Sequence, residues 1–332
     1  MKVWKIIYAA MGVILAAGSI ATAKYGLSEV NRSIYQDALS LDEKMQEFGF
    51  EDFSLKTMKV RFYDGDCDYV AQTDGEGHIT VKKEKAILDV FAGTTVEADG
   101  QWQVLIPTYE QFSGLFDALE ALGSYEQGMQ EGSFAFSESD YSESSHVASI
   151  WHEAFHAWQS ANWSEDVEKL MEQAEVGSGD TSGNTREEII VNEVDSDKEL
   201  SGLFTEEMKL LRKAYQAERM EEKKELVKEA LKIAESRREK LSKTAEAMEY
   251  FLENYEGSAR YVESVVYREL EGEPAWQETY LSEFRYENGS GKYYDMGMMK
   301  CVLLDQLSEG WQKEFSDGAG LDDLLSRAAG GQ

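Results

Sequence analysis

The segment Val147–Trp163 reads VASIWHEAFHAWQSANW. Its apolar side chains recur at the three- and four-residue spacing of one helix face, so the segment predicts a buried helix. The residues that supply this apolar cover are Val147, Ile150, Trp151, Phe155 and Trp158. Polar groups carried by such a helix lie in a water-poor environment, which strengthens their electrostatic interactions.

This helix carries an H-E-x-x-H motif, which runs from His152 through Glu153 to His156. Positions i and i+4 lie on one face of a helix, so both imidazoles can reach a single metal ion. Glu153 lies one step round the helix, where it can contact a zinc-activated water without ligating the metal. The motif therefore predicts a metal site with Glu153 as general base.

Two histidines are too few for a catalytic zinc ion, which usually has three protein ligands and one open position. No third histidine follows at the H-E-x-x-H-x-x-G-x-x-H spacing, because Gln159 and Asn162 occupy the places of that glycine and histidine. This excludes a metzincin. We therefore expect a carboxylate from a later helix as the third ligand.

Glu193 and Glu256 are the two main candidates for this ligand. Glu256 is preferred because Gly257 follows it inside a strongly helical run, where a glycine costs about 1 kcal/mol relative to alanine. Such a glycine often permits close approach of another helix or a ligand. Glu263 lies seven residues further on the same face and could orient a liganding histidine. Glu253 and Glu263 remain as less favoured ligands.

The residues around both motifs resemble a known family. The helix from His152 to Trp158, together with the run from Glu256 to Tyr261 (EGSARY), resembles the zinc-binding pair of helices in gluzincin metallopeptidases. The aminopeptidase branch of that family has a similar H-E-x-x-H-x-W and N-E-G-x-A. The resemblance implies that His152, His156 and Glu256 bind Zn²⁺ and that Glu153 is the catalytic base.

The resemblance extends to the run Tyr294–Gly297, which reads YDMG. In the aminopeptidase branch a tyrosine three residues before a glycine stabilises the oxyanion. The resemblance therefore implies that Tyr294 has this catalytic role, with Tyr293 as a second choice. The H-E-x-F-H-x-x-Q pattern that ends at Gln159 is similar to uncharacterised secreted bacterial gluzincin-like proteins.

The chain also departs from that family. His156 and Glu256 are 100 residues apart, so the intervening helical segment must fold back as a hairpin. The G-A-M-E-N element, which captures the amino terminus of a substrate, is absent upstream of the motif. Aminopeptidase specificity is therefore not implied, and the cleavage preference stays open.

The N-terminus has the organisation of an export signal. Lys2 and Lys5 precede an apolar run over residues 6–17, and Ala21 and Ala23 have the spacing of a cleavage site. This order predicts a signal peptide over residues 1–23. The alternative is an uncleaved anchor, because residues 6–23 could just cross a bilayer. Both place the remainder outside the cytoplasm, as a secreted protein or at the extracellular face of the membrane.

The remaining sequence predicts an α+β protein with a small β-containing lobe and a larger zincin-like helical lobe. Residues 24–57 form an N-terminal helical segment, with a helix over Leu27–Phe48, and residues 58–332 form the catalytic domain. The β-containing lobe covers 58–145 and the helical lobe 146–332, with a helical hairpin insert over about 186–250. Predicted strands, separated by Asp-Gly turns, are Lys59–Tyr63, Ile79–Lys82, Ala86–Phe91 and Trp102–Ile106. We expect a loop over 123–145 and a linker over 177–184.

Composition excludes several functions. The 332 residues contain 33 Lys and Arg against 64 Asp and Glu, a formal net charge of −31. This argues against nucleic acid and against an anionic membrane surface as partners, beyond a possible N-terminal anchor. Two cysteines, Cys67 and Cys301, cannot supply a four-cysteine zinc site. We expect two buried thiols rather than a disulfide, since cysteine packs as a small apolar residue.

Together these patterns predict a secreted zinc-dependent hydrolase, a peptidase whose substrate is a peptide or protein. The alternative comes from another class of protein. The long charged helices, for example Met208–Lys243, could belong to an extracellular binding or structural protein with a vestigial or structural zinc site.

Overall fold

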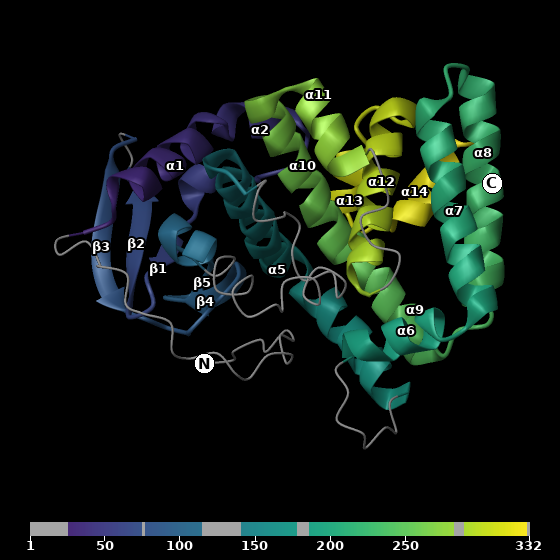
Figure 1. The fold of residues 1–332 in the computed structure, drawn as a ribbon, viewed down its shortest axis with the longest axis horizontal. Helices are drawn as coiled ribbons and strands as arrows, with labels where there is room; N and C mark the ends of the chain where they lie inside the picture. The colour runs from purple at the N-terminus through teal and green to yellow at the C-terminus, as the bar shows by residue number, and fades with distance from the viewer. Residues whose placement is uncertain (1–25, 75–76, 115–140, 178–185, 282–288, 331–332) are drawn as a thin grey trace.

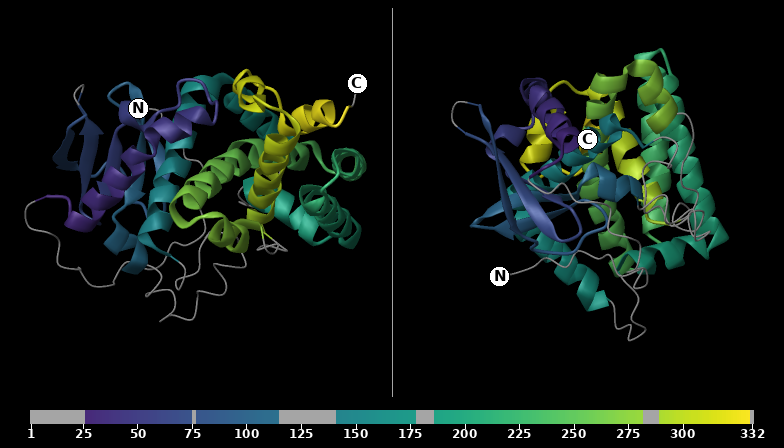
Figure 2. Two further views of the ribbon diagram at one scale, coloured as in Figure 1. Left: turned by 90° about the horizontal axis from the view of Figure 1, so that it is seen from above. Right: turned by 60° about the vertical axis from the view of Figure 1, so that its left-hand side comes forward.

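A five-stranded sheet occupies the N-terminal part of the chain, and helices form the rest (Figures 1 and 2). The computed structural model describes residues 26–74, 77–114, 141–177, 186–281 and 289–330. This architecture confirms the predicted α+β class. The predicted signal over 1–23 lies outside the described residues, as do most of the predicted loop over 123–145 and nearly all of the linker over 177–184.

The sheet is mixed, with strand order β3-β2-β1-β5-β4. The central pair, β1 and β5, is parallel, and the other neighbours are antiparallel. The strands are β1 (Val60–Tyr63), β2 (Cys67–Thr73), β3 (Ile79–Lys85), β4 (Thr94–Ala98) and β5 (Gln101–Pro107). The sequence pattern found β1, β3 and β5 but missed β2 and β4.

The predicted strand Ala86–Phe91 is wrong. These residues connect β3 to β4, and three of their apolar side chains are 41–43% exposed. The reason lies in the partner strand. Lys85 of β3 pairs with Cys67, the first residue of β2, so no ladder partner remains beyond it. The buried Asp68 carboxylate instead accepts a hydrogen bond from the backbone of Ile87 (3.2 Å).

The predicted turn between β4 and β5 is confirmed. Asp99 and Gly100 both have positive φ, 54° and 75°. Two successive residues with positive φ are typical of the two-residue turn that matches the twist of antiparallel strands. Asp99 also accepts an ion-pair contact from Lys59 (2.9 Å).

The helices before and after the sheet pack against each other, α1 (Glu29–Ser40) on α5 (Glu143–Gly177). The predicted first helix is broken at Leu41 into α1 and α2 (Asp42–Glu47), followed by a short 3-10 turn, η1 (Leu55–Thr57). The helix predicted over 147–163 lies inside α5, and Trp163 marks a kink with non-helical backbone angles. Figure 1 shows α5 crossing the middle of the molecule, between the sheet and the remaining helices. It packs on β4 and β5 on one side and on α9 and α10 on the other.

Four helices occupy the predicted insert. They are α6 (Arg186–Asp195), α7 (Lys198–Gln216), α8 (Met220–Arg238) and α9 (Lys243–Phe251). The long helices α7 and α8 pack against each other as a hairpin (Figure 1). Buried apolar residues of α7, among them Phe204 and Leu211, face this contact and the core. In α8, Val227 and Ala230 lie on the buried side of the helix, and most of its charged residues lie on the side that faces solvent.

The C-terminal helices complete the helical part. They are the π-helical turn η3 (Leu252–Glu256), α10 (Gly257–Glu271), α11 (Glu273–Trp276), a second π-helical turn η4 (Gln277–Leu281), α12 (Gly291–Leu307), α13 (Trp311–Ser316) and α14 (Leu321–Ala328). The start of α10 crosses α12 at Gly257 and Gly297. A Cβ atom on Gly297 would lie 2.0 Å from the carbonyl oxygen of Glu253, and one on Gly257 would lie 2.6 Å from Gly297. Close helix approach, the reason expected for Gly257, is therefore confirmed.

Cys67 in β2 and Cys301 in α12 are both buried and unbridged, as expected. Among the described residues, none of the helices combines the length and the apolar character needed to cross a membrane.

Candidate metal centre

Two helical segments far apart in sequence bring three ligand-type side chains together. His152 and His156 come from α5, and Glu256 is the last residue of η3. The two Nε2 atoms lie 3.1 Å apart, and Oε2 of Glu256 lies 3.1 Å from Nε2 of His156 and 3.8 Å from Nε2 of His152. Within the described chain this is the only such group of three His, Cys, Asp or Glu side chains.

These separations fit a tetrahedral zinc ion. Zinc bonds to imidazole nitrogen and carboxylate oxygen are about 2.0–2.2 Å long, so neighbouring ligands in a tetrahedron lie about 3.3–3.6 Å apart. The three observed separations lie on both sides of that value. The fourth corner would remain open, as in catalytic sites.

The other ring nitrogen of each histidine has its own partner. Nδ1 of His152 lies 2.9 Å from Oε2 of Glu263, and Nδ1 of His156 lies 2.8 Å from Oε1 of Gln159. The amide nitrogen of Gln159 donates to the carbonyl of Tyr255 and to the hydroxyl of Ser258, both at 3.0 Å. These contacts fix the orientation of the Gln159 amide, so its oxygen must accept from His156.

A neutral His156 therefore carries its proton on Nδ1 and turns its Nε2 lone pair toward the carboxylate of Glu256. The carboxylate of Glu263, 2.9 Å from Nδ1 of His152, favours the same tautomer for a neutral His152. Three lone-pair donors then face one another at about van der Waals distance, which is unfavourable unless a cation lies between them. A partner on the outer nitrogen is the usual arrangement around metal-bound histidine. The donor set therefore suits a metal ion.

The pKa shifts of His152 and Glu256 also indicate that this centre favours a positive charge. Burial lowers the pKa of His152, but Glu256 and Glu263 outweigh it and raise the pKa to about 10. Burial raises the pKa of Glu256, but His156 and His152 bring it far below its ordinary value. In the metal-free protein a proton would occupy the centre, and a divalent ion would compete with it.

Tyr255 packs against His156 from a third side, a role that nothing in the sequence indicated. Its ring stacks on the His156 imidazole, with centroids 4.6 Å apart and planes at 14°. Its hydroxyl lies 2.9 Å from the Ser160 hydroxyl. These contacts hold the His156 ring in one orientation.

Glu153 lies beside this group of ligands, against the backbone of the loop before β4. A Cβ atom placed on Gly93 would lie 2.6 Å from Oε1 of Glu153, so only glycine leaves room for the carboxylate. Burial raises the pKa of Glu153, an effect that His152 and His156 partly oppose. A carboxylate with a raised pKa is a better proton acceptor than an exposed one. Nothing in the sequence distinguished Gly93 from the other loop glycines.

The expected orienting role of Glu263 agrees with its contacts. Besides approaching His152, Glu263 accepts a hydrogen bond from the Tyr280 hydroxyl (3.0 Å). The Glu263 side chain is buried, and hydrogen bonds from His152 help to hold its pKa below the ordinary value against the effect of burial. Glu263 is therefore an ionised partner for the outer nitrogen of His152, and not one of the three converging ligands.

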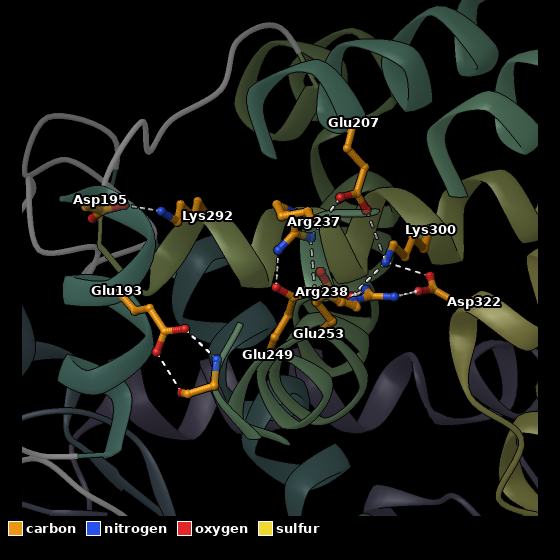
Figure 3. A network of polar contacts seen from close by, with 11 residues as sticks. Glu193, Asp195, Glu207, Arg237, Arg238, Glu249, Glu253, Lys292, Lys300 and Asp322 are labelled. Carbon is orange, nitrogen blue, oxygen red and sulfur yellow. Dashed lines mark hydrogen bonds and ion pairs between the residues drawn. The ribbon is translucent and has the colours of Figure 1, made fainter. Parts of the chain in front are cut away.

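The other candidate carboxylates lie elsewhere. Glu193 accepts hydrogen bonds from the backbone and the hydroxyl of Ser242, both at 2.6 Å, just before α9 (Figure 3). Glu253 is buried and contacts Lys300 (2.7 Å). Neither belongs to the group of converging ligands, which leaves Glu256 as the third candidate ligand.

The two tyrosines of α12 differ in their surroundings. The backbone carbonyl of Tyr294 lies at the crossing with Gly257, one residue from Glu256, and its side chain is half-buried. Tyr293 is fully buried and packs edge-on against Phe204 of α7, with centroids 5.0 Å apart. The backbone of Tyr294 thus lies next to Gly257, the residue after Glu256, whereas the side chain of Tyr293 packs against the α7–α8 hairpin.

The remaining histidine of α5, His146, predicts a pH effect on stability. It is fully buried, its Nδ1 contacts the Tyr141 hydroxyl, and burial lowers its pKa to about 3. The unfolded chain has an ordinary histidine pKa near 6.5, so between about pH 6.5 and 3 only the unfolded state binds this proton. We expect stability to be intact above that window and to fall on acidification, by up to about 1.4 kcal/mol per pH unit.

Urea unfolding of metal-free protein at pH 7, 6 and 5 measures this effect, with His146→Gln for comparison. The variant lacks the titrating group, so the stability difference between the two proteins should shrink by about 1 kcal/mol between pH 6 and pH 5. A difference that stays constant over this range would contradict the assignment.

Comparisons with protein-family models, with curated proteins and with solved structures found no match to this chain.

Proposed function

We propose that the protein is a secreted zinc-dependent hydrolase that acts on peptides or proteins. The observation that carries this proposal is the convergence of His152, His156 and Glu256, with Gln159 and Glu263 close to the outer nitrogens of the two histidines. The half-buried Glu153 next to this group, whose pKa is raised, adds the second element of a hydrolytic site.

His152, His156 and Glu256 would hold the zinc ion. When bound, zinc supplies a Lewis acid that polarises a carbonyl group and lowers the pKa of water. Glu153 would take the proton from the attacking water and later pass it to the leaving amine. Tyr294, whose backbone lies against Gly257, would donate a hydrogen bond to the developing oxyanion.

Export is part of the proposal and rests on the N-terminal sequence. The charged, apolar and small-residue segments over residues 1–23 favour secretion or attachment at the outer face of a membrane. A peptide or protein substrate is favoured by the gluzincin-like motifs, and the acidic composition argues against nucleic acid.

The test is metal-dependent hydrolysis. The chain lacking residues 1–23 would be incubated with a mixed peptide library, with and without a chelator, and the products identified by mass spectrometry. We expect cleavage that the chelator abolishes and that added zinc restores. Stoichiometric zinc without cleavage of any peptide would favour the alternative, an extracellular binding protein with a structural zinc ion.

A further inference from the structure

A network of charged side chains, most of them buried, surrounds Glu253 (Figure 3), which lies three residues before Glu256 in η3. It joins seven side chains from α7, α8, α9, η3, α12 and α14. Its members are Glu207, Arg237, Arg238, Glu249, Glu253, Lys300 and Asp322. Three positive and four negative groups alternate, so each cation contacts at least two carboxylates.

Glu253 connects this network to η3. Its Oε2 lies 2.7 Å from Nζ of Lys300 and 3.0 Å from Nη2 of Arg238. Lys300 also contacts Asp322 (2.6 Å), and Arg238 contacts both Asp322 and Glu249. Lys300 is fully buried and Glu253 is 1% exposed, so solvent does not screen the contact between these two side chains.

The same turn ends in the metal ligand. Glu253 and Glu256 are both in η3, a single π-helical turn between two α-helices. π-Helical turns are rare, and they occur frequently at functional sites, because the wider turn re-aims the residues that follow. The direction of Glu256 therefore depends on whether this turn keeps its shape.

Contacts outside the network hold the turn as well. The carbonyl of Glu253 lies against Gly297, where the backbones of η3 and α12 touch. The Asn254 side chain accepts a hydrogen bond from the backbone of Leu321 (2.8 Å). Glu253 is the residue of η3 whose side chain joins the buried charges.

A buried network of ions is seldom retained for stability alone. Removing charges from water is costly, and well-packed apolar residues often give equal or greater stability. Ionic contacts are more directional than apolar packing, so they suit a segment that must keep one geometry.

We propose that this network, acting through Glu253, holds η3 in the shape that presents Glu256 to His152 and His156. Glu253 is thus a positioning residue, and this inference rests on the proposed zinc site. The proposal also gives the insert a role, since α7 supplies Glu207 and α8 supplies Arg237 and Arg238. The helices that separate the two motifs in sequence would hold the second motif in place.

The test is Glu253→Ala, in which the link between η3 and the two cations is lost. We expect zinc affinity, measured by competition with a chelator well below the unfolding temperature, to fall by about 10–100-fold, as for other outer positions around metal sites. In metal-free protein, amides 252–257 should exchange hydrogen at least about tenfold faster. The second readout is independent of zinc.

Asp68→Ala is the matched control, because it also removes a buried carboxylate from a contact with arginine (Arg61, 3.3 Å). We expect a similar loss of thermal stability, with zinc affinity within about threefold of wild type. Glu253→Gln should restore most of the affinity, because its amide oxygen can still accept from Lys300 and Arg238. Burial raises the pKa of Glu253 although Lys300 and Arg238 lower it, so loss of its charge should cost less than loss of the whole group.

Wild-type zinc affinity in Glu253→Ala, or an equal loss in Asp68→Ala, would overturn the proposal. If Glu253→Ala does not fold, Arg238→Lys replaces it, since lysine cannot span three carboxylates at once; unchanged affinity in that variant would also overturn it. If the wild type binds no zinc, the proposed function fails, and hydrogen exchange over 252–257 still decides whether the network holds η3.

Discussion

Glu153→Gln is expected to bind one zinc ion per chain and to hydrolyse peptides about 10²–10⁴-fold more slowly than wild type. Glutamine has the shape of glutamate and fits the space beside Gly93, but it cannot accept the proton from water. Metal content and kcat/KM on a substrate from the peptide library are the two measurements. If the variant keeps its zinc but loses turnover, Glu153 acts as the base and is not a ligand of the metal.

The control for this change is Glu143→Gln, on the same helix but exposed. Its zinc content and its kcat/KM should match those of wild type. Full activity in Glu153→Gln would refute the mechanism, and loss of zinc would place Glu153 among the ligands instead.

Glu256→Gln should lose zinc. A ligand must be an anion within about 2.0–2.2 Å of the ion, and an amide is a much poorer donor. Glu256 is also the one negatively charged ligand of the three. Without its carboxylate, only the two neutral histidines would remain to hold the zinc ion. We expect less than a tenth of a zinc ion per chain after gel filtration, together with loss of hydrolysis.

Two other carboxylates, Glu193 and Glu263, provide the comparison with Glu256. Glu193→Gln should keep its zinc, because Glu193 caps the start of α9 and lies outside the group of ligands. Glu263→Gln should weaken zinc binding by about 10–100-fold, because it removes the partner of His152 and not a ligand. Stoichiometric zinc in Glu256→Gln would refute the ligand assignment and, with it, the resemblance to the gluzincins.

The sequence predicted the parts of the centre that depend on helical spacing. His152 and His156 are four residues apart, so their shared face follows from the geometry of one helix. Glu256 was preferred because Gly257 indicated a close approach of another helix or a ligand. The structure confirms the close helix approach, since Gly257 lies against Gly297. The orienting role of Glu263 followed from its place two turns along the same face.

Features that depend on contacts between distant segments were not predictable in this way. Tyr255 stacks on His156, and Gly93 makes room for Glu153, only because the fold brings these segments together. The strand predicted over Ala86–Phe91 fails for the same reason, since an apolar run forms a strand only where a partner strand extends beside it. β2 was missed because its first five residues are all buried, which removes the alternation expected of a strand.

The most direct test of the account is the position of the metal itself. Crystals of the chain lacking residues 1–23, grown with zinc, would be measured on both sides of the zinc absorption edge. The account predicts one anomalous peak per chain, about 2.0–2.2 Å from Nε2 of His152, Nε2 of His156 and a carboxylate oxygen of Glu256. A peak at other residues, or no peak at these three side chains in zinc-saturated crystals, would contradict it.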